Sequence, residues 1–310
     1  MLRSVVAGSL AGGAFEAQWV LAVRRKTWKS LHQRDSGGFR FILPPRDRFY
    51  ADPFLLEHQG RTYIFFADYR YSTKKAVISC VWIDRSGDIS QPVTVLEADS
   101  HLSYPFIFEV DRQIYLLPET SQTNRVELYR SVRFPAEWEL VRVLMEQPAV
   151  DATLWQQGGT FWLFANLSAP LEGLDCEDLH LFFSNSLEGK WIPHPKNPVV
   201  VDVSGARPAG RLFLDGHRLI RPAQDCSAAY GHGIALKRVL SLSRTDYREE
   251  ILGRITPEWM PGATGTHTLD HNAEFEVIDL KADRLKTVAQ VARAVRHRRR
   301  NRMQSGSSAS

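Results

Sequence analysis

A unit of two short β-strands joined by a turn recurs five times in this chain of 310 residues. The units begin at residues 52, 104, 151, 207 and 267, so they step forward by 47 to 60 residues. In three units the second strand starts eleven residues after the first, at Asp52 and Tyr63, Tyr104 and Tyr115, and Asp151 and Trp162. A period of this length, with several strands in each unit, is typical of a β-propeller. The repeat therefore predicts an all-β, five-bladed β-propeller.

One further strand is expected before the first unit, at residues 18–24. In a closed propeller such a strand completes the last blade, because an open sheet edge would otherwise stay unpaired. Residues 26–48 contain Gly37-Gly38 and Pro44-Pro45, which predicts a polar connection. We expect a flexible leader at 1–17, one propeller domain at 18–283 and a basic tail at 284–310.

The residue pattern of the tail predicts a basic amphipathic helix at residues 285–302. Apolar side chains fall at helical spacing, with arginines between them, at Leu285, Val288, Val291, Ala292 and Val295. Two interpretations stay open. The helix is either solvated on all sides, or it makes peripheral contact with an anionic membrane surface.

Charge and cysteine content narrow the function classes. The chain has 39 basic and 35 acidic residues, and the excess lies in the tail, so the body is not an electrostatic nucleic-acid binder. Three cysteines without a CxxC pair argue against a disulfide framework or a zinc site. They favour a reducing, cytoplasmic compartment over secretion. No apolar run is long enough to predict a membrane span.

Propeller geometry predicts that polar side chains gather at one mouth of the central channel. The first strand of each blade lines the channel and the second runs back, so the start of one and the end of the other share a mouth. The candidates at these positions are Asp52, Asp68, Tyr104, Glu119, Asp151, Asn166, Arg207, Gln224, Asp225 and His267, with Arg125 and Arg221 as further ligand-binding candidates. Like charges held together are costly unless they are used or neutralised, which indicates a functional site.

Paired carboxyls suit glycoside chemistry, in which one carboxyl protonates the leaving oxygen and another activates water or attacks the sugar carbon. Several aromatic side chains near the same mouth offer faces to a sugar ring, namely Tyr50, Tyr69, Tyr71, Tyr104 and Trp155. For Trp155, packing within its blade is the preferred interpretation.

Two motifs resemble the five-bladed propeller glycosidases, a superfamily that includes arabinanases, xylosidases, invertases and levansucrases. They are Ala51-Asp52-Pro53-Phe54 in the first unit and Val150-Asp151-Ala152-Thr153 in the third. The resemblance implies that Asp52 is the general base or nucleophile, and that Asp151 tunes the acid or holds the sugar.

A closer resemblance is to the N-terminal domain of plant glucosamine inositolphosphorylceramide transferases and its stand-alone bacterial relatives. It extends over residues 18–280, and the motifs that carry it lie at residues 49–54, 117–121, 149–153, 206–210 and 221–225. This resemblance informs the fold more than the activity.

One departure concerns the catalytic acid. The propeller glycosidases place a Glu at the start of blade four, where this chain has Arg207. Glu119 or Asp225 would replace the acid, or Arg207 and Arg221 would clamp an anionic glycoside, nucleotide-sugar or phosphate. His267 resembles a blade-five histidine that lies near a bound ion in some of these glycosidases. With no second ligand in view, we predict no metal and no cofactor.

Two functions stay open. The first is an enzyme that acts on glycosidic bonds, as hydrolase or transferase, in envelope glycan or glycolipid metabolism, with Asp52, Asp151 and Glu119 as catalytic residues. The second is a non-catalytic propeller that binds a saccharide or glycoconjugate beside a separate glycosyltransferase. The carboxylates favour the first, and Arg207 favours the second. A protein-interaction propeller has no need for carboxylates at its channel mouth.

Overall fold

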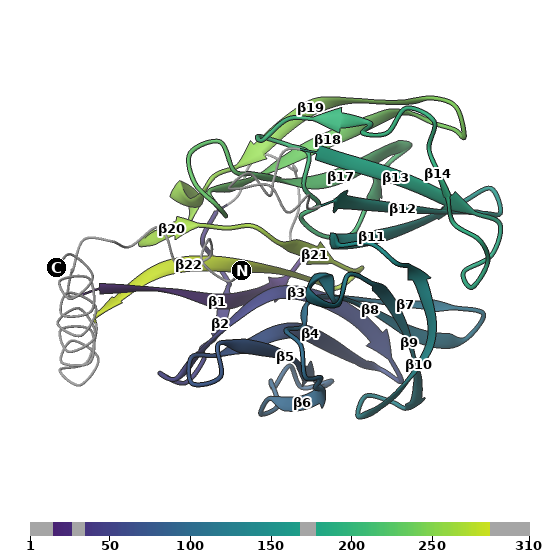
Figure 1. The fold of residues 1–310 in the computed structure, drawn as a ribbon. Helices are drawn as coiled ribbons and strands as arrows, with labels where there is room; N and C mark the ends of the chain where they lie inside the picture. Colours follow the sequence, from purple (N-terminus) through teal and green to yellow (C-terminus); the bar gives the residue numbers. More distant parts are fainter. Residues whose placement is uncertain (1–14, 27–34, 168–177, 286–310) are drawn as a thin grey trace, which may run out of the picture.

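The structure is a computed structural model that describes residues 15–26, 35–167 and 178–285. Its strands form five sheets, which confirms the predicted five-bladed propeller (Figure 1). In the part of the chain that the structure describes, two short 3-10 helices interrupt the strands, η1 (Ser121–Thr123) and η2 (Pro257–Trp259). Within the described residues no helix has the length and apolarity needed to cross a membrane. Leu285, where the predicted basic helix begins, is the last residue of strand β22; the rest of that helix, to residue 302, and most of the leader fall outside the described residues.

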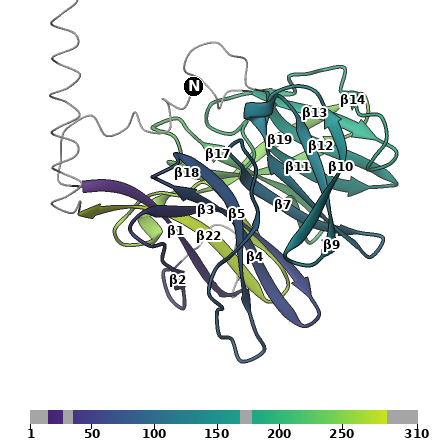
Figure 2. The ribbon, with the colours of Figure 1, turned by 60° about the horizontal axis from the view of Figure 1, so that its bottom comes forward.

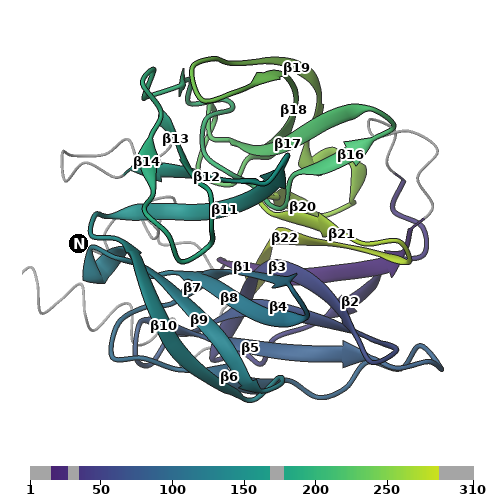
Figure 3. The same ribbon diagram turned by 90° about the vertical axis from the view of Figure 1, so that its right-hand side faces the viewer.

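The first three blades follow the order of the sequence. Blade one contains β3 (Arg48–His58), β4 (Arg61–Arg70), β5 (Lys75–Ile83) and β6 (Val93–Leu96). Blade two contains β7 (Ser103–Val110), β8 (Gln113–Glu119), β9 (Val126–Arg133) and β10 (Glu137–Met145). Blade three contains β11 (Ala149–Gln157), β12 (Thr160–Leu167), β13 (Asp178–Ser184), β14 (Ile192–Pro193) and β15 (Val200–Val201). Figure 3 shows the outer strands β6 and β14 at the periphery of the molecule.

The last two blades complete the ring. Blade four contains β16 (Phe213–Asp215), β17 (Arg218–Asp225), β18 (Gly233–Leu242) and β19 (Tyr247–Ile255). Blade five combines both ends of the chain, with β20 (Ala263–Gly265), β21 (Leu269–His271), β22 (Phe275–Leu285), β1 (Phe15–Arg25) and β2 (Arg40–Ile42).

The N-terminal strand closes the ring as predicted. Strand β1 pairs with β22 over its whole length, from Phe15 opposite Leu285 to Arg25 opposite Phe275. Figures 1 and 2 both show the two strands side by side. Strand β2 lies in the stretch predicted as a loop. It pairs with β1 and forms one edge of the blade-five sheet. Because β2 has only three residues, its pattern is too short to stand out from the surrounding polar sequence.

The core lies between neighbouring blades. Most of β4 is buried on both faces, which explains why its sequence is apolar and aromatic rather than alternating. Phe54 of β3 packs against Phe106 of β7, with ring centroids 5.5 Å apart. Phe134, in the turn between β9 and β10, reaches back to Tyr63 of β4 at 4.7 Å. These aromatic contacts join blade one to blade two.

Candidate functional site

A β-bulge occurs at the same repeat position in the first three blades. Strand pairing shifts register between Ala51 and Phe54, between Ser103 and Phe106, and between Val150 and Thr153. The backbone at the bulge takes a positive φ, of 55° at Asp52, 43° at Tyr104 and 54° at Asp151. Side chains other than glycine rarely adopt this conformation, and such strain concentrates at functional sites. Each bulge re-aims the side chain at the start of an inner strand.

Asp151 is held by two side chains from blade four. Arg207 Nε donates to Asp151 Oδ2 at 2.5 Å, and Gln224 Nε2 donates to the same oxygen at 2.8 Å. The residue is only 3% exposed. Burial raises the pKa of Asp151 to about 6, with Arg207 opposing the shift and Glu119 adding to it. Arg207 thus neutralises part of the negative charge of Asp151.

Asp52 receives its contacts from blades two and five. Its Oδ2 accepts from the backbone N–H of Tyr104 at 3.3 Å, and its Oδ1 accepts from Thr268 Oγ1 at 3.1 Å. The residue is 8% exposed. Burial raises the pKa of Asp52 to about 6, and the charges of Asp151 and Asp279 add to this while His267 opposes it. Asp52 and Asp151 therefore lie within electrostatic reach of each other.

Asp279 of β22 is a site residue that the sequence analysis missed. Its Oδ1 accepts from the backbone N–H groups of His267 and Thr268 at 2.9 and 3.0 Å, and its Oδ2 accepts from that of Asp52 at 3.1 Å. Asp279 Oδ2 also lies 2.5 Å from His267 Nδ1. Burial lowers the pKa of His267, but Asp279 and Asp52 more than offset it, so the pKa is raised overall. One buried carboxylate thus joins blade five to the first bulge.

We call this set the carboxylate cluster, and it consists of Asp52, Asp151, Arg207, Gln224, His267 and Asp279. Within the described chain, Asp52, His267 and Asp279 also have ligand atoms within 4.8 Å of one another, a set able to hold a metal ion. The oxygens of Asp279, however, already accept three backbone N–H groups. His267 is the ligand that the sequence suggested, and the two carboxylates are the partners that the sequence did not show.

Aromatic rings enclose His267. Trp19 of β1 stacks on its imidazole with centroids 4.0 Å apart, and Tyr230 meets it edge-on at 5.4 Å. The guanidinium of Arg207 lies over the ring of Tyr230 at 5.2 Å. Trp19 and Tyr230 were not predicted as site residues, because neither stands at a repeat position.

The remaining predicted residues of blades one to three have separate partners. Tyr104 Oη accepts from the Gly210 N–H at 2.7 Å and lies 2.8 Å from Thr153 Oγ1. Asp68 accepts from Arg48 and Ser79, both at 3.2 Å. Asn166 donates to Asp178, Glu119 is half-buried near Asp151, and Arg125 is exposed.

Arg221 and Asp225 do not join the carboxylate cluster. Arg221 makes two bonds to Glu249, at 2.8 and 2.7 Å, and Asp225 bonds Ser227 and Arg254. Successive side chains of a strand point to opposite faces, so Arg221 and Asp225 face away from the side that carries Gln224. The anion clamp that combined Arg207 with Arg221 is therefore not formed.

Arg221→Met is expected to destabilise the fold by about 3–5 kcal/mol, because it leaves Glu249 buried without its partner. Urea denaturation followed by tryptophan fluorescence measures this loss. The double variant Arg221→Met/Glu249→Met is expected to recover most of the lost stability, because it also removes the unpaired Glu249 carboxylate. An Arg221→Met protein as stable as the wild type would contradict a structural role for this pair.

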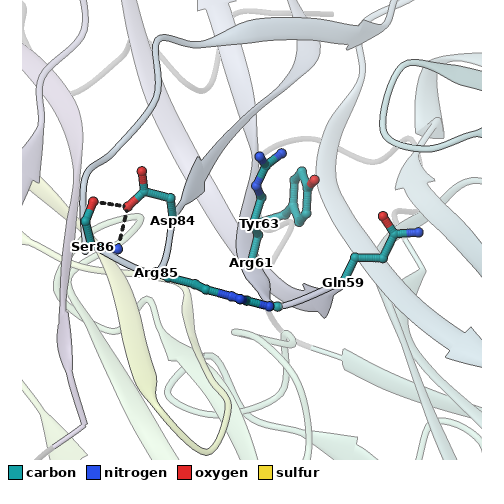
Figure 4. A pocket seen from close by; sticks show the side chains of 7 residues that line it. Gln59, Arg61, Tyr63, Asp84, Arg85 and Ser86 are labelled. Carbon is teal, nitrogen blue, oxygen red and sulfur yellow. Dashed lines mark hydrogen bonds between the residues drawn. The ribbon is translucent and has the colours of Figure 1, made fainter.

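A separate pocket of about 560 Å³ opens at the other end of blade one (Figure 4). It is lined by the turn after β3 and the turn after β5, at Gln59, Gly60, Arg61, Tyr63, Asp84, Arg85 and Ser86. Asp84 Oδ1 accepts from the N–H and hydroxyl of Ser86, as in an ordinary turn. None of the predicted site residues lines this pocket.

Solved structures support the fold. The catalytic domain of a GH62 α-L-arabinofuranosidase from Coprinopsis cinerea aligns with a TM-score of 0.58 and 11% identity, covering 84% of this chain and 97% of that one. A family 117 glycoside hydrolase of Zobellia galactanivorans aligns with a TM-score of 0.53 and 10% identity, covering 86% and 90%. At such low identity the likeness shows the propeller fold alone.

Sequence relatives are more specific. Glucosamine inositolphosphorylceramide transferase 1 of Oryza sativa subsp. japonica is 37% identical over 205 residues, and that of Arabidopsis thaliana is 34% identical over 204. Each match covers 65% of this chain but only 27% of the relative, so the chain spans about a quarter of their length. The family model described as glucosamine inositolphosphorylceramide transferase 1, N-terminal, matches residues 44–259. The chain therefore belongs to the family of this N-terminal domain.

Proposed function

We propose that this chain acts on a glycosidic bond of a saccharide or glycoconjugate, at the mouth of the propeller channel. The observation that carries the proposal is the pair Asp52 and Asp151, two buried carboxyls on strained bulges within electrostatic reach of each other. Burial raises the pKa of both to about 6. Carboxyls with a pKa close to neutral pH are suited to general acid and base catalysis.

The contacts of the two carboxyls support different roles. Asp52 accepts from a backbone N–H and a hydroxyl, which suits a base or nucleophile. Asp151 is fixed by Arg207 and Gln224, which suits a group that holds the sugar or tunes its neighbour. Glu119 raises the pKa of Asp151, so it lies within electrostatic reach of that carboxyl and is the candidate for the replacement acid.

A binding propeller without catalysis is the second candidate. Arg207 occupies the position of the usual acid and neutralises part of the charge of Asp151. The relatives are named glucosamine inositolphosphorylceramide transferases, and this chain matches about a quarter of their length. A site that holds the glycan part of a glycolipid, beside a transferase domain that carries the chemistry, agrees with both facts.

Crystals soaked with pentose and hexose oligosaccharides, together with incubation of the same sugars in solution, test the proposal. We expect electron density for a sugar ring beside Asp52 and Asp151, and shortened or transferred products by chromatography. A bound sugar without any product would favour the binding propeller. If none of the sugars binds, both forms of the proposal fail.

A further inference from the structure

His101 lies in the connection between blade one and blade two, three residues before Tyr104. Its ring is fixed at the end of β5, because Nδ1 accepts from the backbone N–H of Ala76 at 3.0 Å. The backbone N–H of His101 donates to Gln122 Oε1 at 3.1 Å, and the backbone N–H of the next residue, Leu102, donates to the carbonyl oxygen of Ala76 at 3.1 Å. The repeat pattern does not indicate His101, because this residue precedes the repeat positions.

These contacts determine which nitrogen of His101 carries the proton. An Nδ1 atom that accepts an N–H must be unprotonated, so the neutral ring carries its proton on Nε2. Burial lowers the pKa of His101 although the charge of Asp52 raises it, so the ring stays neutral at pH 7. The side chain is half-buried, and Nε2 makes no hydrogen bond with the described residues. The ring therefore presents an N–H donor within electrostatic reach of Asp52, whose carboxylate accepts from the backbone of Tyr104 three residues further on.

An aromatic cluster adjoins this donor. The ring of Tyr69 meets His101 at 6.0 Å, and Phe49 stacks on Tyr69 with centroids 4.6 Å apart. Tyr71 contacts Phe49 at 6.1 Å. Phe49 and Tyr71 are only half-buried, so their rings keep apolar surface accessible. Aromatic surface beside a few directed polar groups is the usual composition of a small-ligand site.

We propose that His101, Phe49, Tyr69 and Tyr71 form a sugar subsite beside Asp52, in which His101 Nε2 donates a hydrogen bond to a ligand hydroxyl. This inference rests on the proposed function and specifies its ligand class. A sugar hydroxyl both donates and accepts, so it matches a carboxylate acceptor at Asp52 and an N–H donor at His101.

The same arrangement disfavours an anionic ring substituent at this subsite. Burial lowers the pKa of His101, which keeps the ring neutral, and the charge that acts on this pKa is the negative charge of the Asp52 carboxylate. Arg207, the cation of the carboxylate cluster, is bound to Asp151. The subsite is therefore suited to a neutral sugar ring rather than to a uronate or a sugar phosphate.

Two variants separate ligand binding from a purely structural role of His101. In His101→Asn, Oδ1 takes the place of Nδ1 and still accepts from Ala76, but the distal donor is lost. In His101→Gln, the amide N–H reaches the position of Nε2, but the acceptor for Ala76 is lost. The probes are the methyl glycosides of glucose, glucosamine, arabinose and xylose, with glucuronic acid as the anionic comparison.

Calorimetric titration and NMR of histidine-labelled protein measure binding. We expect the wild type to bind at least one neutral glycoside more tightly than glucuronic acid, with a shift of the His101 Nε2 resonance. His101→Asn should weaken binding about fivefold with an unchanged melting temperature, the effect of one neutral hydrogen bond. His101→Gln should retain more of the affinity while melting at a lower temperature.

The outcomes distinguish the two levels of the proposal. If the wild type binds a glycoside and His101→Asn binds it equally well, the subsite is overturned while the proposed function stands. Tighter binding of glucuronic acid than of every neutral glycoside likewise overturns the subsite. If no saccharide binds the wild type, the proposed function fails and the subsite fails with it.

Discussion

Removal of residues 1–25 is expected to abolish cooperative folding. This truncation deletes β1, whose pairing with β22 closes the ring, so it leaves β2 without a partner strand and exposes the edge of β22 that β1 covered. Leu21, Ala22 and Val23 are completely buried, and each large apolar side chain contributes about 1.5–3 kcal/mol. Their sum, with the lost strand pairing, approaches the roughly 5–15 kcal/mol that stabilises a whole domain.

A buried ion pair adds to this loss. Arg24 Nε lies 2.5 Å from Glu276 Oε1, and Glu276 is completely buried. Without β1 the Glu276 carboxylate loses its guanidinium partner, and breaking a buried pair in this way costs about 3–5 kcal/mol. The single variant Arg24→Met tests this part of the effect without removing the strand.

Circular dichroism during heating, combined with size-exclusion chromatography, measures the outcome. Deletion of residues 304–310 is the control, because the sequence predicts a tail there rather than a blade strand. The truncated protein is expected to aggregate or to melt without a cooperative transition, while the control melts like the full chain. A protein lacking residues 1–25 that melts within a few degrees of the full chain would refute the closure role of β1.

Asp52→Asn is expected to reduce turnover by about 10²- to 10⁴-fold while ligand affinity stays within about tenfold. Asparagine keeps the shape of the side chain and an oxygen that accepts from the Tyr104 N–H, but it has no basicity. The wild-type rate gives an independent check. Because the ionised carboxylate is the active base, kcat/KM should fall as the pH falls through about 6, the pKa to which burial raises Asp52.

Asp202→Asn is the matched control for this substitution. Asp202, directly after β15, accepts from Ser204 and pairs with Lys237, and among the described residues no hydrogen bond or ion pair joins it to the carboxylate cluster. Its turnover should equal that of the wild type. Two results would exclude Asp52 as the base. One is an Asp52→Asn variant that turns over as fast as the wild type, and the other is a wild-type rate that rises as the pH falls below 6. In a binding propeller the substitution would change affinity alone.

The repeating pattern of strands in the sequence was sufficient to predict the five-bladed architecture. Each unit pairs two strands at a fixed offset, and such pairing depends on neighbours in the chain, so five units predict five blades. The closing strand followed from the same reasoning, since one unpaired apolar strand at the N-terminus must meet one incomplete blade. Side chains alternate between the two faces of β17, so the sequence also implies that Arg221 faces away from Gln224. The repeat positions alone do not indicate this.

The site itself depended on tertiary structure. Asp279, Trp19 and His101 stand at no repeat position. Asp279 contacts Asp52, Trp19 stacks on His267, and His101 lies within electrostatic reach of Asp52, only because the ring brings blades one, two and five together. The bulges at Asp52 and Asp151 set the direction of both carboxyls, and a bulge is an extra residue in one strand of a pair, which appears only when the register of the two strands is known. The sequence by itself determined which carboxyls begin the inner strands. Only the closed ring decided which charges face them, because those partners come from strands distant in the chain.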